Sequence, residues 1–196
     1  MEFTLIYRGP LPSNGNSNQK QKIRDFLHPQ LKELWNHPPL NGKRQWLTPI
    51  GSPENQGFTL VEGRSGFNFV ALVSNKIWLV THLSINFLRN GPPGQLISRG
   101  GDLDNRLKTL FDALALPNEG QIREAPPSVQ MPENFFCLLE DDSLIYSFTV
   151  VADRLLDGTR LHPNHLLSTD HPELEVLLLI RVVTKTTELR VLNLDL

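Results

Sequence analysis

The chain has 196 residues and a formal net charge of −2, a length that suits one domain with a core of its own. Its 19 Lys and Arg residues against 21 Asp and Glu residues count against a general nucleic-acid-binding protein, because such proteins are usually basic. With one cysteine, Cys137, and neither a membrane-length apolar run nor a basic-then-apolar leader in the sequence, we expect a cytoplasmic protein without membrane contact.

The first third of the chain combines two regular segments with long polar connections. Residues 2–8 are expected to form a strand, and the apolar spacing of residues 22–35 predicts a helix that Pro29 kinks or splits. The stretch 36–66 shows no clear periodicity and contains several turn residues. We therefore expect an irregular insertion there, of the kind that is usually functional or mobile in a compact domain.

Lys43, Arg44 and Trp46 form a compact basic and aromatic group within that insertion. Such a loop can hold a nucleic-acid backbone and stack a base on its ring. The alternative is that Trp46 anchors the loop on the core, and the sequence favours neither interpretation.

Strands dominate the rest of the chain. Alternation in residues 67–73 and 77–88 predicts a half-buried antiparallel pair, and residues 144–152 alternate in the same way. Residues 117–134 carry four prolines and predict a second insertion, whereas 174–183 is nearly all apolar and predicts a strand buried on both faces. We predict an α+β fold, with residues 1–196 as one domain in which a mixed or antiparallel sheet packs with a few helices.

The segment between Asp102 and Pro117 predicts an amphipathic helix. Its apolar positions fall on one face with a 3.6-residue period, and these are Leu103, Leu107, Leu110, Phe111 and Leu114. Asp102 suits the N-cap, and Asp104, Lys108 and Asp112 follow at four-residue intervals on the opposite face. On spacing alone this is a solvated charged stripe, with Asp104 and Lys108 as an ion pair.

A second acidic cluster, Glu140-Asp141-Asp142, precedes the strand at 144–152. Asp102 and Asp104 already place two carboxylates at the helix start, where one is enough for capping. Clustered carboxylates repel one another unless a cation neutralises them, and their oxygens suit Mg²⁺ or Mn²⁺. We therefore predict that the two clusters are halves of one divalent-metal site.

The motif Asp-x-Asp-Asn-x-x-Lys over residues 102–108, followed by Asp-Ala-Leu at 112–114 and by Asp-Asp at 141–142 before a strand, resembles the RusA family of Holliday junction resolvases. The opening of the chain, a strand-like stretch followed by Pro12-Ser13-Asn14, is similar to that family's opening strand and turn.

The resemblance implies that Asp102, Asp104 and Asp142 bind Mg²⁺ or Mn²⁺ and that Lys108 is an essential basic residue beside them. Asp142 is preferred to Asp141 because the second Asp of the pair matches the motif. The residues that we expect to contact nucleic acid are Asn14 and Asn105, at the motif's amide positions, and the basic residues Lys43, Arg44 and Arg99.

The resemblance implies a metal-dependent, structure-selective endonuclease that cuts branched DNA, such as Holliday junctions, in recombination and repair. Symmetric cutting of a four-way junction needs two sites related by a two-fold axis, which implies a homodimer. The alternative is a non-catalytic RusA-like protein that binds nucleic acid or a protein partner. The pI of about 6.3, the few basic residues and the two insertions motivate this alternative.

Overall fold

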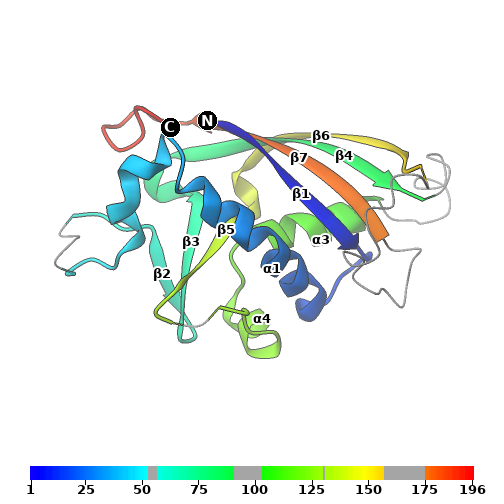
Figure 1. Cartoon of the computed structure of the whole chain (residues 1–196), viewed down its shortest axis with the longest axis horizontal. Helices are drawn as coiled ribbons and strands as arrows, with labels where there is room; N and C mark the ends of the chain where they lie inside the picture. The colour runs from blue at the N-terminus through cyan, green and yellow to red at the C-terminus, as the bar shows by residue number, and fades with distance from the viewer. Residues whose placement is uncertain (53–56, 91–102, 130, 157–174) are drawn as a thin grey trace.

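The computed structural model of the chain describes residues 1–52, 57–90, 103–129, 131–156 and 175–196. Seven strands form two sheets (Figure 1). The large sheet has the order β1 (Glu2–Pro10), β7 (Glu175–Thr186), β4 (Leu79–Arg89) and β6 (Ile145–Arg154). The small sheet has the order β2 (Val61–Arg64), β3 (Phe67–Val73) and β5 (Asn134–Leu139). The helices are α1 (Ser17–Leu34), α3 (Leu103–Leu114) and α4 (Glu119–Glu124), with short 3₁₀ turns η1 (Leu40–Leu47), η2 (Asn75–Ile77) and η3 (Asp142–Leu144).

The large sheet buries one face against α1 and α3 (Figure 1). β7 pairs antiparallel with both β1 and β4, whereas β4 and β6 run parallel. Alternate residues of β4 from Leu79 to Phe87 are buried, which is the period-two pattern of a half-buried strand. Residues of both sheets share one core cluster. The predicted α+β class is therefore confirmed.

The predicted antiparallel pair of residues 67–73 and 77–88 is wrong, although both strands exist. β3 pairs with β2 and, in parallel, with β5, whereas β4 belongs to the other sheet. Between them lies η2, followed by Trp78 with a left-handed φ of 52°. β3 is buried continuously from Phe69 to Val73, as suits the central strand of the small sheet.

The first helix is longer than predicted and is not split. Asn16 begins it with a capping box, in which its side chain accepts a hydrogen bond from the Gln19 N–H and the Gln19 side chain accepts one from the Asn16 N–H. Pro29 lies inside α1 on its exposed side, where water can hydrate the carbonyl that proline leaves without a partner.

The two predicted insertions hold short regular elements. Residues 36–66 contain η1 and β2, and residues 117–134 contain α4, which Asn118 caps. The helical elements η1 and α4, with eight and six residues, and the four-residue strand β2 are too short to show a period among so many turn residues. β7 also differs from prediction, because its residues alternate between buried and half-exposed instead of being buried on both faces. No helix in the described ranges is long and apolar enough to cross a membrane.

Candidate metal site

Helix α3 presents the charged stripe that its sequence predicts. Leu107, Leu110 and Leu114 are buried in the core, so the opposite face points outward. Asp104 and Lys108 are exposed on that face. Asp112 is half-buried, and its Oδ2 lies 2.6 Å from Nζ of Lys20 on α1. The predicted alternative, an ion pair between Asp104 and Lys108, is not formed.

The turn that follows β1 is fixed on α3. Nη1 of Arg106 donates a hydrogen bond to the Leu11 carbonyl at 2.7 Å, and the Gly15 N–H donates one to Oγ1 of Thr109 at 2.9 Å. A Cβ on Gly15 would lie 2.6 Å from Cγ2 of Thr109, so this close approach requires glycine. Asn14, exposed and with a φ of 51°, is thereby held beside the middle of α3.

The carboxylates of residues 140–142 differ in what they contact. Glu140 accepts hydrogen bonds from Oγ of Ser74 at 2.5 Å and from the Asn75 N–H at 2.9 Å. Asp141 caps η3, and hydrogen bonds from Ser143 lower the pKa of its carboxyl. The carboxylate of Asp142 is exposed and has no hydrogen bond or ion pair with any residue that the structure describes. Asp142 is therefore the carboxylate of this run that is free to bind a ligand.

A polar pocket of about 240 Å³ joins the C-terminal part of α3 to this acidic run. Its lining consists of Arg64, Asp112, Ala115, Leu116, Asn118, Gln121, Glu140, Asp141 and Asp142. The structure thus brings one carboxylate of the α3 stripe near the second acidic cluster, but that carboxylate is not among the predicted metal ligands. That carboxylate is Asp112, whereas Asp104 lies two helical turns earlier, about 12 Å along the axis, and does not line the pocket.

The remaining predicted ligand, Asp102, lies outside the described residues, as does Arg99. Within the described ranges, no three His, Cys, Asp or Glu side chains are grouped closely enough to hold a metal ion. Asp104 and Asp142 are nevertheless exposed carboxylates without partners there, and such oxygens suit a hard cation that keeps several of its waters. Their chemistry fits Mg²⁺, and their assignment as ligands stays a prediction.

The basic and aromatic group at 43–46 is used within the protein. Trp46 is only 3% exposed and packs edge-on against Phe58, so it anchors the loop on the core. Nζ of Lys43 lies 5.2 Å from the centre of the Trp46 ring and 3.1 Å from Oδ1 of Asp195. Arg44 donates a hydrogen bond to the side chain of Asn36. Among the predicted nucleic-acid contacts, Asn105 is the one carried by α3 itself, where it is half-exposed.

Several residues around the pocket were not predicted. Arg64 donates hydrogen bonds to Glu62 and to the Pro117 carbonyl, which places its guanidinium at the wall of the pocket. It comes from a strand of four residues inside a stretch without periodicity, so the sequence carried no signal for it. Asp112 did carry one, because it continues the stripe of Asp104 and Lys108 by one further turn.

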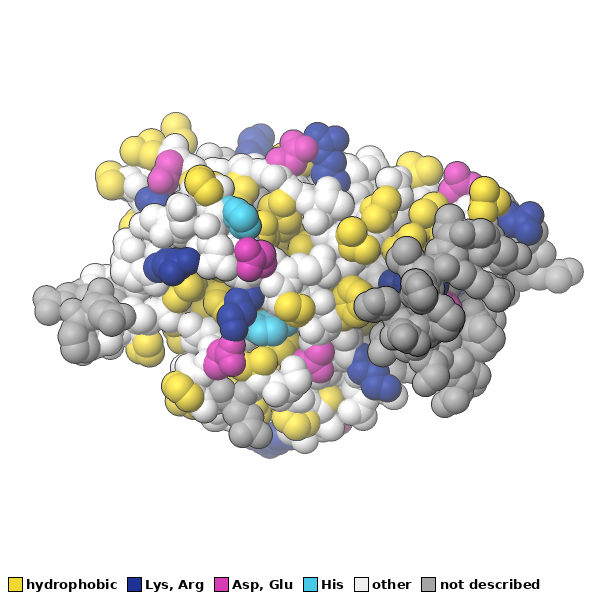
Figure 2. Space-filling view, viewed as in Figure 1, with side chains coloured by type: hydrophobic (Ala, Val, Ile, Leu, Met, Phe, Trp, Pro, Cys, Tyr) yellow, Lys and Arg dark blue, Asp and Glu magenta, His cyan; other side chains and the backbone are white. Residues whose placement is uncertain are grey.

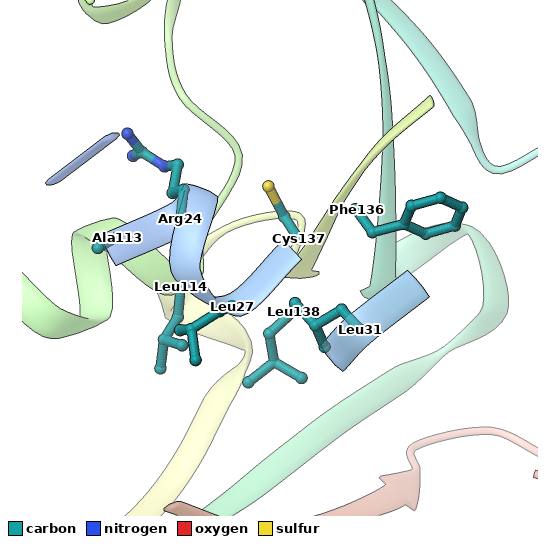
Figure 3. A pocket seen from close by; sticks show the side chains of 8 residues that line it. All are labelled: Arg24, Leu27, Leu31, Ala113, Leu114, Phe136, Cys137 and Leu138. Carbon is teal, nitrogen blue, oxygen red and sulfur yellow. The ribbon is translucent and has the colours of Figure 1, made fainter. Parts of the chain in front are cut away.

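Arg24 of α1 holds α3 and α4 in place through hydrogen bonds. Its guanidinium is buried and donates hydrogen bonds to the Asp112 carbonyl, the Ala115 carbonyl and Oε1 of Gln121 at 2.6–3.1 Å. Arg24 also borders a narrow internal space between α1 and β5 (Figure 3). Cys137 faces the same space, and burial raises the pKa of its thiol to about 12, so it is an unreactive core residue.

No family model, no curated protein and no solved structure matches this chain. The RusA resemblance therefore depends on the motif residues and their order alone.

Proposed function

We propose that the protein is a Mg²⁺- or Mn²⁺-dependent, structure-selective endonuclease of the cytoplasm. Its substrate is branched DNA, and the Holliday junction is the branched structure that we propose it cuts. The observation that carries the proposal is the state of Asp142. In an acidic run whose other two carboxylates have structural hydrogen bonds, the carboxylate of Asp142 alone has no partner among the described residues. It is also the residue that the motif assigns to the metal.

In this proposal Asp104 and Asp142, together with Asp102, would hold the cation. It would supply a water molecule of lowered pKa and positive charge beside the scissile phosphate. Lys108 is one turn beyond Asp104 on the exposed face of α3, where its ammonium can contact a phosphate oxygen. Lys20 of α1 is already paired with Asp112, whereas Lys108, the one lysine of α3, is left for the substrate.

Asn14 adds a polar contact to the same surface. Gly15 donates a hydrogen bond to the side chain of Thr109, the residue that follows Lys108 on α3. This contact holds the turn that contains Asn14 against α3. An amide side chain there can bind the sugar–phosphate backbone without reading the bases. Two copies of the protein would supply the two symmetric cuts that resolve a four-way junction.

The proposal is tested on a synthetic four-way junction incubated with Mg²⁺, with Mn²⁺ or with EDTA, with linear duplex as the control substrate. Paired nicks across the junction that require the metal are expected. Equal cutting of junction and duplex, or cutting that persists in EDTA, would contradict the proposed activity.

The second candidate is a non-catalytic protein that binds nucleic acid or a protein partner. Two observations favour it. Lys20, Arg24, Lys43 and Arg44 are all engaged inside the protein. On the face shown in Figure 2, the Lys and Arg side chains are scattered among acidic ones instead of forming one patch. Tight binding to the junction without nicking in either metal is the result that this candidate predicts.

A further inference from the structure

Two arginines of the large sheet lie side by side without an acidic partner. Arg89 of β4 and Arg154 of β6 are directly opposite each other in the register of these parallel strands. Neither guanidinium has a hydrogen bond or ion pair with any residue in the described ranges, and Nε of Arg89 is buried. Like charges at neighbouring strand positions repel each other, and a buried donor without an acceptor is destabilising. An anion bound between the two guanidiniums would remove both effects.

The other arginines in the described part of the chain show how unusual this pair is. Ion pairs with glutamate side chains hold Arg8, Arg64, Arg123, Arg181 and Arg190. Hydrogen bonds to carbonyl or amide oxygens hold Arg24, Arg44 and Arg106. Arg89 and Arg154 are therefore the two whose guanidiniums remain open to an acceptor from outside the chain. Arg154 is exposed and Arg89 is partly exposed, so such an acceptor can reach both.

The two side chains project from the face of the sheet that packs on α3. Phe148, six residues before Arg154 on β6, contacts Phe111 of α3 with 5.1 Å between the ring centres. Phe87, two residues before Arg89 on β4, is fully buried on the same face. Residues an even number of positions apart lie on one face of a strand, so both arginines lie on the α3 side of the sheet.

The arginine pair also lies at the end of the sheet where α3 begins. Through β7, Arg89 is in one row with Gly9 at the end of β1. Leu11 follows shortly after, and its carbonyl accepts the hydrogen bond from Arg106 of α3. Arg106 comes two positions after Asp104, so the pair is at the same end of the molecule as this predicted metal ligand. Figure 1 shows the ends of β4 and β6 on the same side as the start of α3.

We infer that Arg89 and Arg154 together bind a backbone phosphate of the DNA strand that passes the start of α3. The planar guanidinium fork matches two oxygens of a phosphate, which makes arginine the residue best suited to this contact. The inference rests on the proposed function, because that function is what brings DNA to α3. Lys108 lies on the outward face of the helix, whereas the arginines belong to the sheet behind it. The arginine pair thus holds a phosphate other than the scissile one and fixes the DNA in position without reading its sequence.

The first test is the affinity for a labelled four-way junction and for linear duplex, measured by fluorescence anisotropy in EDTA at several salt concentrations. Arg89→Gln and Arg154→Gln should each weaken binding of both DNAs about ten-fold. Each should also reduce the slope of log K against log salt by about one. Arg181→Gln is the matched control, because Arg181 is exposed on the opposite face of the same sheet, and it should bind like the parent.

Parental affinity in Arg89→Gln and Arg154→Gln, or an equal loss in Arg181→Gln, would overturn the inference. A parent that inorganic phosphate stabilises against heat, but that binds neither DNA, would assign the pair to a free anion and would overturn it too. EDTA prevents metal-dependent cutting, so these results are separate from nuclease activity. Arginine-dependent binding by a protein that never nicks supports the pair and contradicts the nuclease. Nicking by a parent whose affinity is independent of both arginines does the reverse.

The stability of the free protein separates a binding role from a structural one. Arg154→Gln should leave the melting temperature unchanged or raise it, because it removes the repulsion from Arg89. Arg8→Gln is the contrasting variant, since Arg8 forms a mostly buried ion pair with Glu175 and its loss should lower the melting temperature. A fall in Arg154→Gln as large as that in Arg8→Gln would show that Arg154 supports the fold, and it would overturn the inference.

Discussion

Lys20 on α1 and Asp112 on α3 form an ion pair with 2.6 Å between Nζ and Oδ2. The side chains are 16% and 25% exposed, so the pair is partly shielded from water. It joins the first helix to α3, the helix that carries the predicted metal ligand Asp104, at the edge of the polar pocket. The ion pair therefore contributes both to the packing of the two helices and to the charge of the pocket.

Replacing Asp112 by Asn should lower the free energy of unfolding by about 1 kcal/mol, because Lys20 loses its partner in a partly shielded position. Urea unfolding of Asp112→Asn, Lys20→Met and the double variant measures the coupling between them. Glu119→Gln is the control, since the Arg123–Glu119 pair is largely exposed and its loss should be close to neutral. Equal effects at the two pairs would show that the position of the Lys20–Asp112 pair adds nothing.

Gly15→Ala should destabilise the protein, because the added Cβ would meet Cγ2 of Thr109 at 2.6 Å. A loss of about 1–3 kcal/mol is expected, as for other overpacked positions. Thr109→Ser removes the clashing methyl group but keeps the hydroxyl that accepts the Gly15 hydrogen bond. The double variant should therefore recover part of the loss. Gly42→Ala, which has open space around it, is the control.

The protein should lose stability as the pH falls below about 6.5, because of His28. Burial lowers the pKa of His28, and the nearby Lys32 ammonium lowers it further, while Glu133 and Asp25 act in the opposite direction. Its Nδ1 accepts a hydrogen bond from the Phe136 N–H at 2.9 Å, which only the unprotonated nitrogen can do. The unfolded chain takes up the proton first, so the stability is complete above the unfolded pKa and is lost between that value and the lower folded one.

The measurement is the denaturation midpoint as a function of pH for the parent and for His28→Gln, whose amide oxygen can still accept from Phe136. The parent should show a steeper fall between pH 6.5 and the lower folded pKa of His28 than the variant does. Parallel pH profiles for the two proteins would contradict the assignment to His28.

The elements that could be predicted are those whose patterns are long and local. α3 follows from twelve residues with an apolar face. The acidic run at 140–142 lines the polar pocket beside α3, and its role as half of a metal site stays a prediction. The start of α1 was missed although its signal is present, because the capping box of Asn16 and Gln19 lies in a stretch that is otherwise polar. Trp46 shows what composition cannot predict. A loop with basic and aromatic residues has the same sequence features whether its aromatic ring is buried in the core or exposed to bind a ligand.

The pairing of strands could not be predicted, because it depends on residues far apart in the chain. β3 and β4 are neighbours in sequence, yet β4 lies between β7 and β6. Buried residues from Phe69 to Val73 identify β3 as a central strand only once β5 and α1 are in place. The exposure of β6 has the same origin, since an alternating pattern does not say whether a strand lies at the edge of its sheet.

The most direct test of the proposed metal site compares Asp142→Asn with Asp141→Asn in the four-way junction assay with Mg²⁺. Asn at position 141 can still cap η3, so that variant should fold and nick the junction like the parent. Asp142→Asn should fold and bind the junction but not nick it, because a carboxylate ligand of the cation is lost. If Asp142→Asn nicks the junction at the parental rate, Asp142 is not a metal ligand and the proposed site is wrong.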